Sequence, residues 1–263
     1  MPRYRLTIEY DGTGLVGWQR QPAGVSVQGA LEAAIVGYCG VKVTVYGAGR
    51  TDAGVHALAQ IAHIDLPREA PPDTIRGAIN FHLRPHAVSV VAVEPAPDNF
   101  HARMSARERV YRYRILNRRA PPALERGRVW HVAPTLDLEA MRAGAAHLIG
   151  HHDFSTFRDS LCQAKSPVKT LDVLDLSRVG DEIGVEVRAR SFLHHQVRNM
   201  VGTLKLVGLG SWRPDDVARA LAARDRRAGG PTAPAAGLTL IEVRYPPEII
   251  SPCPPIGRRG FDR

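Results

Sequence analysis

The order of strand-like and helix-like periodicities is the feature that most narrowly limits how this chain can fold. Over residues 3–10 apolar side chains alternate with polar or charged ones, which predicts a strand buried on one face. Ser26 then stands at an expected helix N-cap, and apolar residues between 27 and 35 fall on one helical face. The remaining elements of this half are strands over 41–45, 57–65 and 88–93 and a helix opened by Pro71-Pro72-Asp73. The resulting order, strand-helix-strand-strand-helix-strand, is ferredoxin-like.

A second run of periodic segments follows the first. Gly180-Asp181 separates two strand-like segments and predicts a hairpin, and Gly150 is expected to end a helix. The expected elements are strands over 109–116, 171–179, 183–190 and 238–243 and helices over 137–149, 196–208 and 214–224. We therefore expect an α+β fold of two ferredoxin-like halves, with antiparallel or mixed sheets joined around a central basic cleft.

The expected boundaries divide the chain into three parts. Residues 1–105 form an N-terminal α+β half, and residues 106–245 form a C-terminal α+β half that completes the cleft. Residues 246–263 are rich in Pro and Gly. Such a tail is suited to be an arm that another subunit orders by packing.

An excess of positive charge indicates a polyanionic partner. The chain carries 35 Lys and Arg residues against 26 Asp and Glu, a formal net charge of +9. Neutralising phosphates with such charges releases condensed counterions, which favours binding to nucleic acid. Only four of the basic residues are Lys, so part of the excess also fits a general preference for Arg. The charge therefore raises the expectation of nucleic-acid binding without deciding it.

The spacing of the cysteines and the lengths of the apolar segments do not fit a disulfide-stabilised, zinc-stabilised, secreted or membrane-spanning protein. Cys39, Cys162 and Cys253 are far apart and form neither a CxxC pair nor a cluster with histidines, so neither a disulfide framework nor a structural zinc site is indicated. The first residues contain no apolar signal-peptide core, and no uninterrupted apolar run is long enough for a bilayer span. We therefore expect a cytoplasmic protein.

A glycine-rich segment between two expected strands carries the most chemical information. Over residues 47–56 it reads Gly-Ala-Gly-Arg-Thr-Asp-Ala-Gly-Val-His, which places Arg50 and Asp52 among three glycines. Glycines leave room for a substrate to approach the backbone. Arg50 is suited to hold the Asp52 carboxylate ionised or to bind a phosphate, and an ionised, positioned carboxylate is a recognised covalent catalyst. Taken alone, Thr-Asp-Ala-Gly equally fits a hairpin turn in which Asp52 caps backbone amides.

The glycine-rich segment and further motifs over nearly the whole chain resemble the tRNA pseudouridine synthase A family. These motifs are Ile-Glu-Tyr-Asp-Gly at 8–12, Gly-Trp-Gln-Arg-Gln at 17–21, Asp-Asn-Phe-His-Ala-Arg at 98–103, Tyr-Arg-Tyr at 111–113, His-Asp-Phe-Ser-Thr-Phe at 152–157, Phe-Leu-His-His-Gln-Val-Arg-Asn at 192–199 and Gly-Leu-Thr-Leu at 237–240. In this order and spacing the set is highly specific. One departure is Leu15-Val16 ahead of Gly17-Trp18, where relatives often carry an aromatic residue.

The resemblance implies an isomerase, of the intramolecular transferase type, with the pseudouridine synthase fold. It would convert uridine to pseudouridine at positions 38, 39 and 40 in the anticodon stem-loop of tRNA, without a cofactor or metal. Asp52 matches the catalytic aspartate, and Tyr111 matches a tyrosine that stacks on the flipped-out base, whose lost stacking an aromatic face partly restores. Arg198 would pair with Asp52, and Leu240 would border the uracil pocket. By residue type alone, Tyr111 and Leu240 fit ordinary core positions and Arg198 an exposed helical one.

RNA contacts are expected from several further side chains. Arg50 belongs to the motif and is suited to contact the RNA backbone or flanking bases. Candidate phosphate contacts, each of which equally fits a solvated surface position, are His101, Arg103, Arg20 and Lys169. The resemblance also implies a homodimer that binds tRNA across both subunits. It leaves the chemical step of Asp52 open among attack at C1′, addition to uracil C6 and a glycal route.

Two other functions fit parts of the sequence. An RNA-binding or RNA-chaperone protein without chemistry would suit the charge, but it gives no reason for Asp52 with Arg50 and Tyr111. A small-molecule carboxylate enzyme, such as a hydrolase, lacks a Ser/His/Asp arrangement, a metal cluster and a second obvious carboxylate. His194-His195 suggests a metal, but adjacent residues are expected to project differently, and no third ligand is evident.

Overall fold

Strand pairing in the computed structural model, which describes residues 1–249, reveals two similar halves. The first half contains β1 (Arg3–Tyr10), α1 (Val27–Cys39), β2 (Tyr46–Gly47), β3 (His56–Asp65), α2 (Pro72–Leu83) and β4 (Val88–Ala96). Its strands pair antiparallel in the order β4-β1-β3-β2. The first strand is thus central, between the third and the fourth, as in a ferredoxin-like unit, and the expected α+β arrangement is confirmed here.

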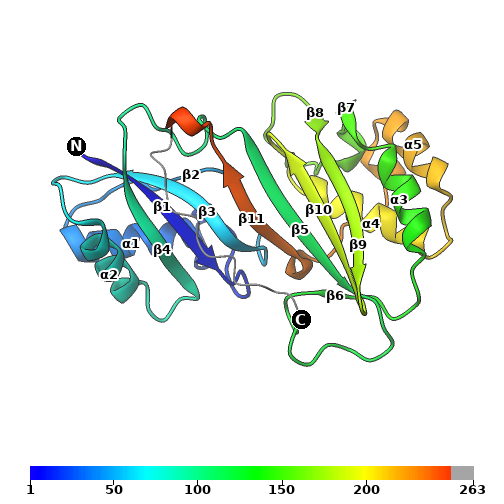
Figure 1. Cartoon of the computed structure of the whole chain (residues 1–263), viewed down its shortest axis with the longest axis horizontal. Helices are drawn as coiled ribbons and strands as arrows, with labels where there is room; N and C mark the ends of the chain where they lie inside the picture. Colours follow the sequence, from blue (N-terminus) through cyan, green and yellow to red (C-terminus); the bar gives the residue numbers. More distant parts are fainter. Residues whose placement is uncertain (250–263) are drawn as a thin grey trace.

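The second half repeats this arrangement. It contains β5 (Glu108–Leu116), β6 (Trp130–His131), α3 (Leu138–Ala146), β7 (Gly150–Asp153), β8 (Val168–Leu171), β9 (Val173–Val179), β10 (Glu182–Ala189), α4 (Gln196–Gly208), α5 (Pro214–Ala223) and β11 (Leu238–Arg244). Its longer strands pair antiparallel in the order β11-β5-β10-β9, so that β5 takes the place that β1 has in the first half. Figure 1 shows α1 and α2 beside the strands of the first half and α3, α4 and α5 beside those of the second.

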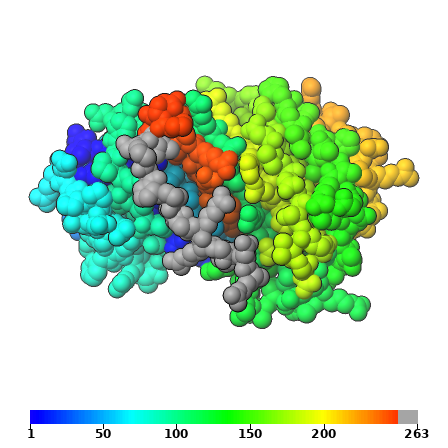
Figure 2. Space-filling view, viewed as in Figure 1, coloured from blue at the N-terminus to red at the C-terminus, as the bar shows by residue number. Residues whose placement is uncertain are grey.

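A short parallel pair joins the two halves into one sheet of nine strands within the described residues. Thr239 and Leu240 of β11 lie opposite His56 and Ala57 at the start of β3, and β2 pairs with the other end of β3. The loop over residues 48–55 runs from β2 to the start of β3, so it lies where the halves meet. In the upper middle of the space-filling view, orange and red atoms of β11 and of the residues up to 249 lie between the blue to teal atoms of the first half and the green and yellow atoms of the second (Figure 2).

Local sequence signals explain where several helices begin and end. The Ser26 side chain accepts the Gly29 N–H (3.1 Å) and caps α1, and the helix ends at Gly40, whose φ of 75° disfavours any residue with a side chain. Helices α2 and α5 begin at Pro72 and Pro214, where a missing N–H breaks no helical hydrogen bond. The expected cap at Ser26 and the expected helix starts are confirmed.

The expected strand over residues 41–45 is wrong, because this segment is a loop. Val43 and Val45 are buried, as their alternation indicated, but side chains of α1 take the place of a partner strand. Glu32 Oε1 accepts the Val45 N–H (3.2 Å), and Gln28 Nε2 donates to Val45 O (3.1 Å). Alternation over so few residues reports which side chains face the core, and a loop packed on a helix produces the same pattern.

Two further boundaries differ from expectation. The helix expected over 137–149 ends at Ala146, and Gly150, with a φ of 111°, begins β7 rather than capping the helix. The strand expected over 171–179 is divided at Asp172. Strand β8 turns away there to pair with β7 in a separate two-stranded sheet, whereas β9 stays paired with β10.

The expected tail over residues 246–263 is described only as far as residue 249, and the rest lies outside the described residues. Its first part includes one 3-10 turn, Pro247–Ile249. Across residues 1–249, none of the helices combines the length and the apolar character that a bilayer-spanning segment requires.

Candidate active site

The loop over residues 48–55, here called the Asp52 loop, is held in place by the first half of the chain. The Trp18 N–H donates to Thr51 O (3.0 Å). The Thr51 hydroxyl lies 2.7 Å from the hydroxyl of Tyr10, which is the last residue of β1. These contacts on both sides of residue 51 fix the backbone immediately before Asp52.

Two glycines allow the loop that precedes α1 to press against the Asp52 loop. A Cβ on Gly12 would lie 2.2 Å from Val55 O, and a Cβ on Gly17, whose φ is 99°, would lie 2.7 Å from Thr51 O. The Gly12 N–H also donates to Nδ1 of His56 (3.0 Å). Two motifs that are separate in the sequence thus meet in a backbone contact that leaves no room for a side chain.

Three basic side chains converge on Asp52. Arg198 Nη1 donates to Asp52 Oδ2 at 3.0 Å, and the Nε2 atoms of His194 and His195 lie 3.4 Å from Oδ1 and Oδ2, respectively. Arg198 Nε also donates to Ala233 O (2.8 Å), which fixes the direction of the guanidinium. The Asp52 side chain is 18% exposed, so it is largely buried and still reachable from solvent. The structure brings Asp52 and Arg198 together, as the resemblance implied.

The charge state of Asp52 follows from these contacts. Burial by itself would raise the pKa of the carboxyl group, but hydrogen bonds from His194 and Arg198 and the charge of His195 outweigh burial and hold the pKa below its usual value. In return, the hydrogen bond to Asp52 raises the pKa of His194. Asp52 is therefore ionised at neutral pH, which is the state that a carboxylate nucleophile needs.

His195 has a left-handed backbone conformation, with a φ of 62°, and this brings its ring beside that of His194. The ring centroids are 4.0 Å apart, and the interplanar angle is 35°. The expectation that the adjacent histidines project differently is therefore wrong. Asp52 supplies the third possible metal ligand, which was not evident in the sequence. A non-glycine residue in a disfavoured conformation costs about 1–3 kcal/mol, and such residues concentrate at functional sites.

A second carboxylate, Asp159, holds the other side of both imidazoles. Its Oδ2 lies 2.8 Å from Nδ1 of His195, and its Oδ1 lies 3.5 Å from Nδ1 of His194. The Asp159 N–H donates to His194 O (3.1 Å), so backbone and side chain both tie this loop to the histidines. No sequence pattern singled out Asp159, although it follows closely on the motif at 152–157.

Tyr111 and Leu240 lie opposite each other on the neighbouring strands β5 and β11. Leu240 is fully buried and also lies opposite Ala57 of β3. Tyr111 is 8% exposed, and its ring packs edge-on against Phe192, with 5.3 Å between centroids. Burial raises the pKa of Tyr111, and the charge of Asp52 contributes to the same shift. The charge of Asp52 is thus one of the influences on the Tyr111 hydroxyl.

Arg50 takes a different place from the one that its position in the motif suggested. It is exposed, and its Nη1 donates to Oε1 of Gln163 at 3.0 Å. Arg198, and not Arg50, supplies the guanidinium that Asp52 binds. Of the two roles considered for Arg50, contact with RNA is the one that this exposed position suits.

His101 and Arg103 lie in the link between the halves. Nδ1 of His101 accepts the N–H groups of Arg103 (3.1 Å) and Met104 (3.2 Å), and its ring packs against His63 at 4.7 Å between centroids. Across residues 1–249, no hydrogen bond or ion pair joins His101 or Arg103 to Asp52. His101 therefore shapes a turn, and the structure does not draw these two residues into the Asp52 cluster.

We expect the folded state to lose about 2 kcal/mol of stability between pH 7 and pH 4.5 through His63 alone. Burial lowers the pKa of His63 to about 4, the charges of His101 and Arg3 add to this, and its Nδ1 accepts the Ala102 N–H (3.1 Å). In the unfolded chain the imidazole takes up its proton near pH 6.5. Stability is thus fully present above pH 6.5 and is lost as the pH falls toward 4.

Urea unfolding midpoints at pH 7 and pH 4.5 measure this effect. A His63→Asn variant, which keeps an acceptor near the Ala102 N–H but does not titrate, is the matched comparison. Its midpoint should fall less on acidification than that of the unchanged protein. An equal fall in both proteins would contradict the assignment to His63.

Arg109 is a buried cation that no sequence pattern singled out. Its Nη2 donates to Ala48 O (2.7 Å) at the start of the Asp52 loop and to Arg103 O (2.9 Å) in the link between the halves. Burial lowers the pKa of Arg109, and no carboxylate within residues 1–249 forms an ion pair with it. Arg109 therefore stabilises the junction through neutral carbonyl groups.

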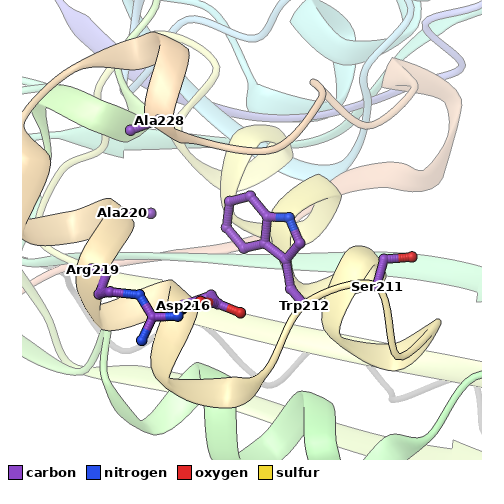
Figure 3. A pocket seen from close by; sticks show the side chains of 6 residues that line it. All are labelled: Ser211, Trp212, Asp216, Arg219, Ala220 and Ala228. Atoms are coloured by element: carbon purple, nitrogen blue, oxygen red, sulfur yellow. Dashed lines mark ion pairs between the residues drawn. The ribbon is translucent and has the colours of Figure 1, made fainter.

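A pocket also lies beside α5, at the end of the second half that is remote from the first (Figures 1 and 3). Its lining residues are Ser211, Trp212, Asp216, Arg219, Ala220 and Ala228. Asp216 and Arg219 form an ion pair with each other. The pocket contains none of the residues around Asp52, so it forms no part of the candidate site.

Comparisons with known proteins find a matching family and relatives of high identity. A family model described as tRNA pseudouridine synthase matches residues 6–104 and 145–246. A tRNA pseudouridine synthase A of Paramagnetospirillum magneticum is 65% identical over 245 residues, which cover 93% of this chain and 96% of the relative. The proteins of the same name from Rhodospirillum centenum and Caulobacter vibrioides are 64% and 59% identical, and the matches cover 93% of this chain and 100% and 99% of those relatives.

Proposed function

Because the chain belongs to the tRNA pseudouridine synthase family, and is therefore an enzyme that isomerises uridine to pseudouridine in tRNA, we propose that it acts at positions 38, 39 and 40 of the anticodon stem-loop. The proposal depends on Asp52 above all. Its ionised carboxylate lies at the junction of the halves and is paired with Arg198, and its charge contributes to the raised pKa of Tyr111. The choice of these three positions rests on the motifs shared with the synthase A family.

In the proposed reaction, Asp52 is the catalytic residue. The bond from C1′ to N1 of uracil breaks, the base turns, and a bond from C1′ to C5 forms. C5 loses its proton to solvent and the freed N1 takes up a proton, so that the product is an isomer of the substrate. Tyr111 stacks on the extruded base, and Leu240 closes the apolar side of its pocket. Arg198 keeps Asp52 charged while the nucleotide enters. Attack at C1′, addition to C6 and a glycal route all use the same unprotonated carboxylate.

The RNA surface is proposed to extend from this centre. Arg50 is exposed in the Asp52 loop and is suited to a phosphate or a flanking base, and His101 and Arg103 would contact the RNA further along the link. Residues 1–105 then supply the catalytic loop, and residues 106–245 supply Tyr111 and Arg198. A homodimer in the cytoplasm, with tRNA in a basic cleft and across both subunits, completes the proposal.

Modification of an unmodified tRNA transcript tests this function. The transcript carries tritium at C5 of its uracils and uridine at positions 38, 39 and 40, and it is incubated with the full chain. We expect tritium release in proportion to pseudouridine formed, and carbodiimide-dependent primer-extension stops at those three positions. Transcripts with cytidine at one of the three positions are the controls, and each should lose one stop. Stops at other positions would reject the site assignment, and binding without tritium release would indicate an RNA-binding protein.

A further inference from the structure

Two imidazoles and one carboxylate converge on a small volume beside Asp52. Asp52, His194 and His195 each offer one possible ligand atom, and these three atoms all lie within 4.8 Å of one another. Each Nε2 atom is 3.4 Å from one carboxylate oxygen. Ligand atoms of a tetrahedral zinc ion, at about 2.0–2.1 Å from the metal, are roughly 3.3 Å apart. Each imidazole nitrogen therefore already lies at about this spacing from one carboxylate oxygen.

The far sides of the two rings are held in the way that metal sites require. A histidine that binds a metal usually donates its other ring N–H to a carboxylate, which orients the ring and its free nitrogen. Asp159 has this position, with 2.8 Å to Nδ1 of His195 and 3.5 Å to Nδ1 of His194. Both Nε2 atoms consequently face Asp52. The left-handed backbone at His195 is the local feature that makes this common direction possible.

We propose that Asp52, His194 and His195 bind a divalent cation of the zinc type, and that the bound cation inhibits the enzyme by occupying the catalytic carboxylate. Two imidazoles favour zinc and similar transition metals, whereas Mg²⁺ prefers oxygen ligands and octahedral geometry. Three protein ligands leave a fourth position for water, and the His194 side chain is 37% exposed, so an ion can enter from solvent. The inhibition rests on the function proposed above, and the binding does not.

Arg198 limits the affinity of this site without closing it. Its guanidinium lies 3.0 Å from Oδ2, so it opposes a second cation near the same carboxylate. Oδ1 faces His194 and receives no hydrogen bond from Arg198. A metal on Oδ1 leaves the ion pair at Oδ2 in place, and a tRNA that enters the site competes with the metal for Asp52.

Calorimetric titration of the full chain with ZnCl₂, in buffer containing Mg²⁺ and no RNA, tests the binding site. Co²⁺, whose visible absorption reports tetrahedral coordination, serves as a second probe. We expect one bound Zn²⁺ per chain, affinity reduced about 10- to 100-fold in Asp159→Asn, and a still larger loss in His195→Gln. His151→Gln, which removes an exposed histidine from β7, is the matched control and should bind Zn²⁺ like the unchanged protein.

Tritium release from tRNA, measured over the same range of Zn²⁺, tests the inhibition. The unchanged protein and His151→Gln should lose turnover as the site fills and regain it when a chelator is added. Equal Zn²⁺ affinity in the unchanged protein and His195→Gln would overturn the proposed site. Stoichiometric binding with full turnover would overturn the inhibition. Absence of turnover before any metal is added would instead count against the proposed function, while the calorimetry still decides the site.

Discussion

Replacing Asp52 by asparagine is expected to reduce pseudouridine formation at least about a thousandfold while tRNA affinity stays within a few-fold of the original. The amide has the same size and can still hydrogen-bond, but it carries no charge and cannot act as a nucleophile. The carboxylate is largely buried beside Arg198, so its loss changes the electrostatic interaction with the tRNA phosphates only slightly. Turnover by tritium release and affinity by filter binding are measured side by side.

A matched control for Asp52→Asn is Asp175→Asn, which removes the same charge from an exposed position on β9. This variant should keep both turnover and affinity. Near-normal turnover in Asp52→Asn would remove Asp52 from the mechanism. A parallel loss of tRNA affinity would show that the residue serves binding instead, and thermal unfolding of both variants separates either result from a folding defect.

Replacing Arg198 by methionine is expected to lower turnover by about 10²–10³-fold. The methionine fills part of the same space, but Asp52 Oδ2 loses its 3.0 Å partner and Ala233 O loses its 2.8 Å donor. The largely buried carboxylate then keeps only the two histidines as basic neighbours. Its position is less constrained, and its pKa rises because the Arg198 hydrogen bond that lowers it is lost. An unpaired carbonyl at Ala233 also costs about 1–3 kcal/mol of stability if it stays buried.

The matched variant is Arg198→Lys, which keeps the positive charge but lacks the planar guanidinium donors. It separates the effect of charge from that of hydrogen-bond geometry. We expect it to retain more activity than Arg198→Met and less than the unchanged protein. Turnover under saturating tRNA and the midpoint of thermal unfolding are measured for all three proteins. Equal turnover in the lysine and methionine variants would mean that the positive charge of Arg198 does not support Asp52.

Much of the secondary structure was predictable because its signals are local. The alternation over residues 3–10, the cap at Ser26 and the hairpin at Gly180-Asp181 each depend on neighbours a few residues away, and the structure confirms them. Prediction failed over residues 41–45, where the partners of the backbone are side chains of α1. Periodicity reports burial, and it does not identify what covers a segment.

The candidate site was predictable in part. The motif around Asp52 and the family resemblance pointed to Arg198, and the structure joins the two residues across 146 positions of sequence. Asp159 and Arg109 were not predicted, because a lone acidic or basic residue has no pattern that distinguishes a buried positioning role from a surface one. Two roles fit Arg50 in the sequence, and its exposed position and the pairing of Asp52 with Arg198 favour contact with RNA.

The sequence by itself determined most of the element order and the family, and it predicts which carboxylate reacts, since these depend on residue type and short spacing. Only the tertiary structure decided that both histidines face Asp52 and that Asp159 holds them. Their directions depend on one left-handed backbone angle at His195 and on the pairing of β11 with β3, which joins the two halves of the site. Contacts between residues so far apart in the sequence produce no periodic pattern from which they could be predicted.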